Sequence, residues 1–189
     1  MRILDILLGR SRPVPSKLER LFAISTAYLT LTAELQLQPG ERAGVCFRPL
    51  ESGQFARMQP DLEGLLQISG RETGTTIGTR VDSYGFQWVT LDDPEFEDLV
   101  TTIHLVSLTL QEHGFGDQLL AAVFKFLYKE QPVYWIYNYK RGSFYPFVPR
   151  GGSRERDNAA ELRLKAAMEK ELPMEADLEH WYPLWGIPI

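Results

Sequence analysis

The sequence predicts an α+β fold, in which an antiparallel sheet of mainly hairpin-connected strands carries helices packed on it. Several short segments alternate apolar and polar residues with a period of two, which is typical of half-buried strands. Other segments repeat apolar residues at helical spacing. The expected order is helix, hairpin, helix, hairpin, helix, strands and helix. This order is neither the alternation of a parallel α/β sheet nor an all-β pattern, so it favours the α+β class.

Composition narrows the class of protein further. The chain has 189 residues, of which 44% are hydrophobic and 12% aromatic, enough to close a core, so we expect a single domain over residues 1–189. The formal net charge of −5 disfavours nucleic acid as a partner. Cys46 is the only cysteine, which excludes an internal disulfide. No apolar run approaches the ~20 residues of a membrane span, and no signal peptide is evident, so we expect a cytoplasmic protein.

Two helices are expected before the first strand. Residues 1–12 should form a short amphipathic helix. A second helix should follow Pro15, with Ser16 as its cap. The residues expected on its buried side are Leu18, Leu21 and Phe22.

The first hairpin is predicted from a change of period. From Leu29 to Leu37 every second residue is apolar, which indicates a strand. Gln38–Glu41 contains Pro-Gly and should form a turn, with Gly40 at a positive φ. Ala43, Val45 and Phe47 then alternate in a returning strand.

The central part should contain two helices separated by a hairpin. Pro60 should open a helix that ends at Ser69-Gly70. Residues 75–81 and 86–91 should pair as a hairpin. The next helix should be capped by Asp92 or Asp93 and end at His113-Gly114. Its expected buried residues are Phe96, Leu99, Val100, Ile103, Val106 and Leu110.

The last third is expected to contain three strands, a helix and an irregular end. Residues 119–129 fit a buried helix almost as well as a strand. We favour a strand, because 133–139 and 143–148 beside it are predicted strands. Ser153 should cap a helix that Pro173 ends. The residues expected to face inward from it are Leu162, Leu164, Ala167, Met168 and Leu172. Residues 174–189 should be an irregular aromatic tail packed on the domain.

No residue pattern indicates an assembled reactive centre. The histidines His104, His113 and His180 lack the spacing of helical metal ligands. Cys46 should be a packed, inert thiol on the strand face opposite Val45 and Phe47. The glycine-rich stretch 70–78 lacks Gly-Lys-Ser/Thr, and the carboxylates of 92–98 suit helix capping better than calcium. The sequence therefore predicts no catalytic residue, metal or cofactor, and a protein that is not an enzyme.

Two surfaces are candidates for binding. The hairpin around Tyr139-Lys140-Arg141-Gly142 is rich in aromatic residues, which either belong to the core or form a docking edge for a partner. The candidate partner-binding residues, together with the aromatics of the tail, are Tyr137, Tyr139, Lys140, Arg141, Phe144, Tyr145, Trp181 and Trp185. The N-terminal helix either packs on the sheet or makes weak peripheral contact with an anionic membrane. The candidate membrane-contact residues are Ile3, Leu4, Leu7 and Leu8.

Four stretches of the chain are distinctive: ILDILLGRSRPVP, GVCFRP, VYWIYNYKRGSFYPFVP and ELPMEADLEHWYPLWGIPI, within which YKRG-x-FYPF and W-x-PLW are the most specific patterns. Together they resemble the PspAB family of PspA-associated proteins. The resemblance covers nearly the whole chain and implies a role in the bacterial envelope stress response beside PspA, a membrane-remodelling protein. It implies no catalytic or ligand-binding residues. The order of elements is also similar to the small α+β chaperones of bacterial secretion, at the level of fold.

Three functional hypotheses follow. The first is a non-enzymatic adaptor or chaperone-like module that binds a PspA-like partner. The alternative is a small-molecule sensor or an enzyme with a pocket between sheet and helices. A third interpretation is a homodimer formed through strand edges or the aromatic tail.

Overall fold

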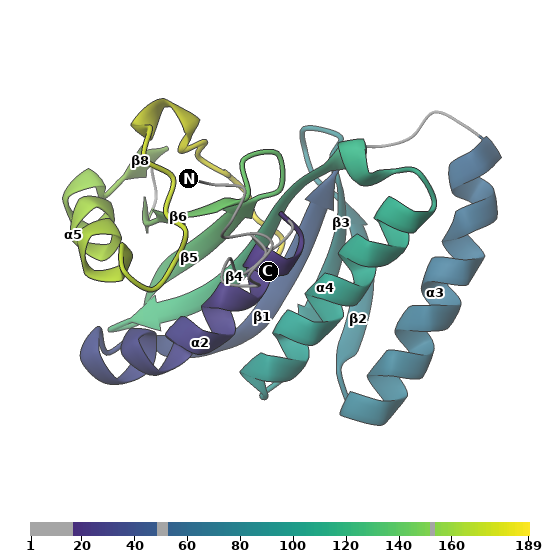
Figure 1. Cartoon of the computed structure of the whole chain (residues 1–189), viewed down its shortest axis with the longest axis horizontal. Helices are drawn as coiled ribbons and strands as arrows, with labels where there is room; N and C mark the ends of the chain where they lie inside the picture. Colours follow the sequence, from purple (N-terminus) through teal and green to yellow (C-terminus); the bar gives the residue numbers. More distant parts are fainter. Residues whose placement is uncertain (1–16, 49–52, 152–153) are drawn as a thin grey trace, which may run out of the picture.

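The computed structural model describes residues 17–48, 53–151 and 154–189, and a six-stranded antiparallel sheet forms its centre (Figure 1). The strand order is β2-β3-β1-β4-β5-β6, so the α+β prediction is confirmed. The strands are β1 (Gln38–Phe47), β2 (Thr76–Val81), β3 (Gln87–Asp92), β4 (Leu119–Tyr128), β5 (Gln131–Asn138) and β6 (Ser143–Phe147), with a separate short pair of β7 (Pro149–Arg150) and β8 (Glu155–Arg156).

The predicted hairpin of β2 and β3 is confirmed, with Thr76 opposite Asp92 and Val81 opposite Gln87. Its turn is built on Asp82, whose Oδ1 accepts the backbone N–H groups of two later residues, Tyr84 and Phe86. Side-chain acceptors of this kind stabilise turns because they replace backbone partners. The strands β4, β5 and β6 also form as predicted, so residues 119–128 are a strand and not a helix.

Helix α4 (Phe96–Glu112) is the predicted central helix, and its six expected apolar residues are all buried. The predicted cap, Asp92 or Asp93, is wrong, because Glu95 occupies the N-cap position and no side chain caps the helix there. Asp93 instead shapes the turn that precedes the helix. The Oδ1 atom of Asp93 accepts the N–H of Glu95, and its Oδ2 accepts the hydroxyl of Thr75 at 2.5 Å. The helix ends where Gly114 adopts a φ of 84°, as the His113-Gly114 pair predicts.

The strand predicted over 29–37 is wrong, because this segment continues a helix. Helix α2 (Ala23–Leu29) follows a 3-10 turn, η1 (Glu19–Phe22), and runs on into a π-helical turn, η2 (Thr30–Glu34). Residues at helical spacing, Leu21, Ile24, Ala27 and Leu31, are completely buried, whereas Leu29 is 73% exposed. Helical spacing of the buried residues therefore overrides the alternation of leucines. The prediction that Phe22 is buried is also wrong, since 38% of it is exposed.

The turn predicted at Gln38–Glu41 is wrong as well, because these residues begin β1. Pairing of β1 with β4 is irregular between Pro39 and Ala43, and Glu41 in this stretch has a φ of 54°. Gly40 does not adopt the predicted positive φ; a Cβ there would lie 2.7 Å from Cγ of Lys125. The glycine therefore permits a close approach to β4 at a strand irregularity instead of a chain reversal.

Helix α3 (Gly53–Thr73) is longer than predicted at both ends. It starts before Pro60, which lies inside the helix, and continues past Gly70. A Cβ at position 70 would lie 2.6 Å from the carbonyl oxygen of Thr75. Gly70 thus serves the close packing of the helix against the start of β2, and it does not end the helix.

Helix α5 (Asn158–Met168) begins at Asp157, whose side chain accepts the N–H of Ala160, and ends before Pro173. The predicted cap, Ser153, lies outside the described residues. Of the residues expected to face inward, Leu162 and Ala167 are exposed, Leu164 is partly buried, and Met168 and Leu172 are buried. The predicted inward face is therefore only partly correct.

Both faces of the sheet are covered. Helices α2 and α4 cross one face, α3 lies beside the edge strand β2, and α5 packs beside β6 (Figure 1). The opposite face is covered by residues 174–189, called the C-terminal segment below, through buried Trp181 and Ile189 and partly buried Leu184, Trp185 and Ile187. Because the sheet separates its two faces, the apolar residues buried on them form two core clusters, one on each face.

Candidate binding cavity beneath the C-terminal segment

The C-terminal segment begins as an extension of the sheet. The N–H of Phe144 donates to the carbonyl of Pro173, and the N–H of Glu175 donates to the carbonyl of Phe144, each at 2.8 Å. Phe144 and Met174 form a parallel bridge. This short pairing occupies the outer edge of β6 at Phe144 and directs the following residues onto the sheet.

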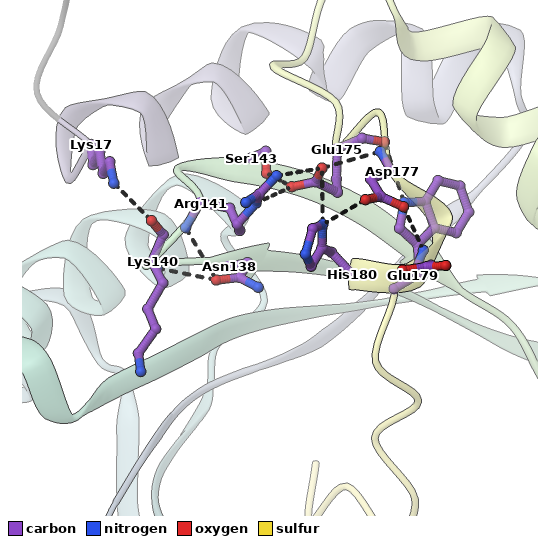
Figure 2. Close-up of polar contacts among 10 residues, drawn as sticks. Lys17, Asn138, Lys140, Arg141, Ser143, Glu175, Asp177, Glu179 and His180 are labelled. Carbon is purple, nitrogen blue, oxygen red and sulfur yellow. Dashed lines mark hydrogen bonds and ion pairs between the residues drawn. The ribbon is translucent and has the colours of Figure 1, made fainter.

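A cluster of polar side chains around Glu175 fixes this connection (Figure 2). Arg141 donates from Nε to Oε2 of Glu175 at 3.0 Å and from Nη2 to Oε1 at 3.3 Å. Ser143 adds a hydrogen bond at 2.8 Å, and the N–H of Asp177 adds one at 3.1 Å. The Arg141 hydrogen bonds hold the pKa of Glu175 down at about 2, against the opposing effect of burial. The carboxylate is 5% exposed, so it stays charged inside the protein because its partners surround it.

His180 and Trp181 extend the cluster into the short 3-10 turn η4 (Leu178–His180). Nδ1 of His180 lies 3.4 Å from Oδ2 of Asp177 and 3.8 Å from Oε1 of Glu175 (Figure 2). The indole N–H of Trp181 donates to the carbonyl oxygen of Glu175 at 3.2 Å. The ring of Trp181 stacks on Tyr145 with centroids 6.1 Å apart. The cluster therefore positions the ring that anchors the segment on the sheet.

Three more contacts hold the rest of the segment in place. The hydroxyl of Tyr145 donates to the carbonyl of Tyr182 at 3.0 Å. Trp185 meets Phe147 edge to face, with ring centroids 5.1 Å apart. Lys125 donates to the carbonyl of Ile189 at 3.3 Å. The segment is thus a fixed wall over the sheet, although it contains no long helix or strand.

A cavity of about 570 Å³ lies between this wall and the sheet. Its volume falls within the roughly 300–1,000 Å³ typical of ligand pockets. The sheet side is lined by Cys46, Trp88, Leu120, Ala121 and Tyr145. The turn of the β2–β3 hairpin and the residue after it contribute Asp82, Tyr84 and Phe86. The C-terminal segment contributes Tyr182, Pro183, Leu184 and Trp185. Three polar residues, Arg48, Asn138 and Lys140, complete the lining.

The charged residues of the cavity differ in their partners. Asp82 accepts three hydrogen bonds, since Oδ1 accepts two turn N–H groups and Oδ2 accepts the indole N–H of Trp88 at 2.9 Å. The exposed side chains of Arg48 and Lys140 make no hydrogen bond or ion pair with another described residue. In Figure 2 the Lys140 side chain points away from the Glu175 cluster. The lining therefore carries two cations that have no partner within the described part of the chain, and one carboxylate that already accepts three hydrogen bonds.

Cys46 lies on the floor of the cavity as an unreactive thiol. Its side chain belongs to the core cluster opposite that of Val45 and Phe47, as the strand pattern predicts. Burial, with a smaller contribution from the negative charge of Asp82, raises the pKa of the Cys46 thiol to about 12. A thiol with this pKa is protonated at neutral pH and is a poor nucleophile.

The predicted docking hairpin is largely core. Among the candidate partner-binding residues, Tyr137, Tyr139 and Phe144 are buried beneath the helices. Tyr145 is buried beneath the C-terminal segment, and Trp181 of that segment is buried against the sheet. The interpretation of an exposed aromatic edge is therefore wrong, because both faces of this hairpin are covered. Lys140 and Arg141 at its turn are exposed, and Trp185 is partly buried at the cavity.

Several residues at the cavity could not be selected from the sequence. Arg48, Tyr84 and Trp88 come from segments far from residues 182–185, and only the strand pairing brings them together. The one signal for them in the sequence was the aromatic W-x-PLW stretch, because large apolar side chains are stabilised by packing against another surface, away from water. Ile3, Leu4, Leu7 and Leu8, the predicted membrane contacts, lie outside the described residues.

Within residues 17–48, 53–151 and 154–189, no three His, Cys, Asp or Glu side chains gather where a metal ion could bind. No helix of the described chain combines the length and the apolar character that crossing a membrane requires.

Comparison with known proteins identifies the family. Searches of curated proteins and of solved structures find no match. A family model described as PspAB, PspA associated protein B, matches residues 1–189, which is the whole chain. The chain therefore belongs to the PspAB family of PspA-associated proteins.

Proposed function

We propose that this chain is a non-enzymatic adaptor, chaperone-like in its mode of action, that binds PspA or a PspA-like partner at the cavity beneath the C-terminal segment. Membership of a PspA-associated family supports the identity of the partner. We assign the binding site to this cavity because of the residues at its rim. Tyr84 and Tyr182 are each 53% exposed there, beside Trp185, Arg48 and Lys140. Tyrosine, tryptophan and arginine are the residues that most often dominate binding energy at protein interfaces.

The protonation state and hydrogen bonds of the ionisable groups near the cavity support a binding function in preference to a catalytic one. The Cys46 thiol is protonated at neutral pH, and the carboxylate of Asp82 holds the hairpin turn and Trp88. Glu175 is engaged by Arg141 and Ser143. A general base or nucleophile needs a free lone pair directed at a substrate. The Cys46 thiol is a poor nucleophile, and Asp82 and Glu175 direct their carboxylates at groups of the fold.

A pull-down with PspA tests this proposal. Replacing the two exposed aromatics, Tyr84→Ser and Tyr182→Ser, should weaken retention of PspA at least about tenfold, which corresponds to about 1.4 kcal/mol. Tyr128→Ser is the matched control, because Tyr128 is 38% exposed and lies at the far end of β4, outside the cavity. Circular dichroism checks that all variants fold. Unchanged retention of PspA by the double variant would contradict binding of PspA at this cavity.

A second candidate function is favoured by a smaller cavity of about 330 Å³ between the sheet and helix α5. It is lined by apolar residues such as Leu37, Val133 and Leu164, together with Arg163. If the chain is a small-molecule sensor, its ligand would bind here, between the sheet and helix α5. A ligand at a hundred times its Kd adds about 2.7 kcal/mol to stability. A thermal-shift screen of metabolites with wild type and Leu164→Trp, which fills this cavity, tests the idea; equal shifts in both proteins would contradict it.

A further inference from the structure

We propose that the cavity beneath the C-terminal segment selects a partner segment in which acidic residues flank a large apolar side chain. This inference rests on the proposed function for the nature of the occupant, a protein segment. The chemistry of the occupant comes from the charges and the apolar lining of the cavity.

The charges favour an acidic occupant. Arg48 follows the end of β1 and Lys140 lies in the turn between β5 and β6, so the two cations reach the cavity from different elements. Neither side chain has a partner among the described residues. A carboxylate placed between them would gain charge-assisted hydrogen bonds, which are stronger than neutral ones.

The carboxylate of Asp82 does not cancel this preference. Its two oxygens already accept three hydrogen bonds, from the N–H groups of Tyr84 and Phe86 and from the indole of Trp88. One acceptor site of Oδ2 remains, and the single negative charge of Asp82 is outnumbered by the positive charges of Arg48 and Lys140. A lysine or arginine in the cavity would meet Arg48 and Lys140, and such like-charge repulsion adds specificity against basic segments.

The lining also requires an apolar group. Trp88 is 2% exposed and Ala121 is 7% exposed on the sheet side, and Leu184 and Trp185 face them from the C-terminal segment. Ala121 leaves room because its side chain is small, between Cys46 on β1 and Asn138 on β5. An aromatic or branched side chain that enters this space removes apolar area from water, which drives binding.

Peptide titrations test the inference on the full-length protein. Three fluorescein-labelled nine-residue peptides share a central phenylalanine and leucine and differ only in flanking glutamate, glutamine or lysine residues. Fluorescence anisotropy should give a Kd for the glutamate peptide about tenfold lower than for the glutamine peptide, with the lysine peptide weakest. The Arg48→Gln/Lys140→Gln variant should bind glutamate and glutamine peptides equally. Lys129→Gln/Lys170→Gln removes the same charge away from the cavity and should keep the preference.

Two kinds of result would overturn the inference. One is equal affinity of wild type for the glutamate and glutamine peptides, or an undiminished preference in Arg48→Gln/Lys140→Gln. The other is unchanged peptide binding by Ala121→Trp, or by Ala121→Leu if the larger side chain prevents folding, because both fill the cavity. Failure of the proposed function looks different: wild type would not retain PspA, while the charge preference for peptides would persist.

Discussion

At the scale of single residues, the carboxylate of Glu175 accepts four hydrogen bonds that hold the candidate site together. One carboxylate joins the turn that carries Arg141, the strand that carries Ser143 and the start of the C-terminal segment. A carboxylate with few donors would be costly to bury, whereas four donors compensate for the loss of water. The wall of the cavity is therefore held by an ionic contact whose strength depends on the charge of Glu175.

Glu175→Gln should lower the free energy of unfolding by about 1.5–3 kcal/mol, the usual contribution of a hydrogen bond to a charged group. Urea denaturation at pH 7 measures the difference. Glu179→Gln is the control, because Glu179 is exposed and its side chain accepts no hydrogen bond among the described residues, so a change within about 0.5 kcal/mol is expected.

The same substitution has a predictable pH dependence. The pKa of Glu175 is lowered in the folded protein from 4.5 to about 2, chiefly by Arg141. A lowered carboxyl pKa contributes stability that is complete above the unfolded value and is lost as pH falls towards the folded value. The difference between wild type and Glu175→Gln should thus be constant above about pH 4.5 and shrink between pH 4.5 and 2. A difference that stays the same at pH 3 would contradict the assigned charge state.

At the scale of elements, the segment from Leu29 to Leu37 shows how one pattern can satisfy two periods. Its leucines alternate as in a strand, but Leu31 also continues the helical series that begins at Leu21. Local alternation does not reveal that earlier buried residues extend the helix. Packing of α2 against α4 favours the helix over the strand. The local sequence pattern does not contain this tertiary contact, so it could not be predicted from that pattern.

Two substitutions separate the helix from the predicted strand. In a strand, Leu29 and Leu31 would share one buried face, so both would be sensitive. In the helix, Leu31→Ala should cost about 2–5 kcal/mol as a buried leucine does, and Leu29→Ala should cost less than about 0.5 kcal/mol. Chemical denaturation measures both. Similar large losses for the two variants would contradict the helical assignment.

Elements with strong local signals were predictable from the sequence. Helix α4 has acidic residues in its first turn, six apolar residues at helical spacing and a glycine at its end. The β2–β3 hairpin has Asp82 and Gly85 in its turn. The pair Pro39-Gly40 misled because the same residues that favour turns also occur at strand irregularities. Pro60 and Gly70 misled similarly, since α3 tolerates both in its interior.

At the scale of the whole molecule, the cavity arises from long-range pairing. The order β2-β3-β1-β4-β5-β6 places the β2–β3 hairpin and the β5–β6 turn around the face that residues 182–185 cover. Sequence reasoning selected Lys140, Tyr145 and Trp185, which line the cavity, because aromatic and basic residues are conspicuous. It could not find the residues opposite them, since no local pattern encodes which strands become neighbours.

The two edges of the sheet differ in a way that bears on self-association. The C-terminal segment pairs with β6 at Phe144, while β2 pairs only with β3 among the described residues. An uncovered edge can accept another strand. The homodimer through strand edges or the aromatic tail, suggested by the sequence, stays a prediction.

Amide hydrogen exchange of the chain with and without PspA tests the central claim most directly, because it locates the docking site without any substitution. Residues 82–86 and 182–186, which meet at the cavity, should exchange more slowly in the complex. Slower exchange confined to α3 and β2, or no change at the cavity when PspA is bound, would contradict it.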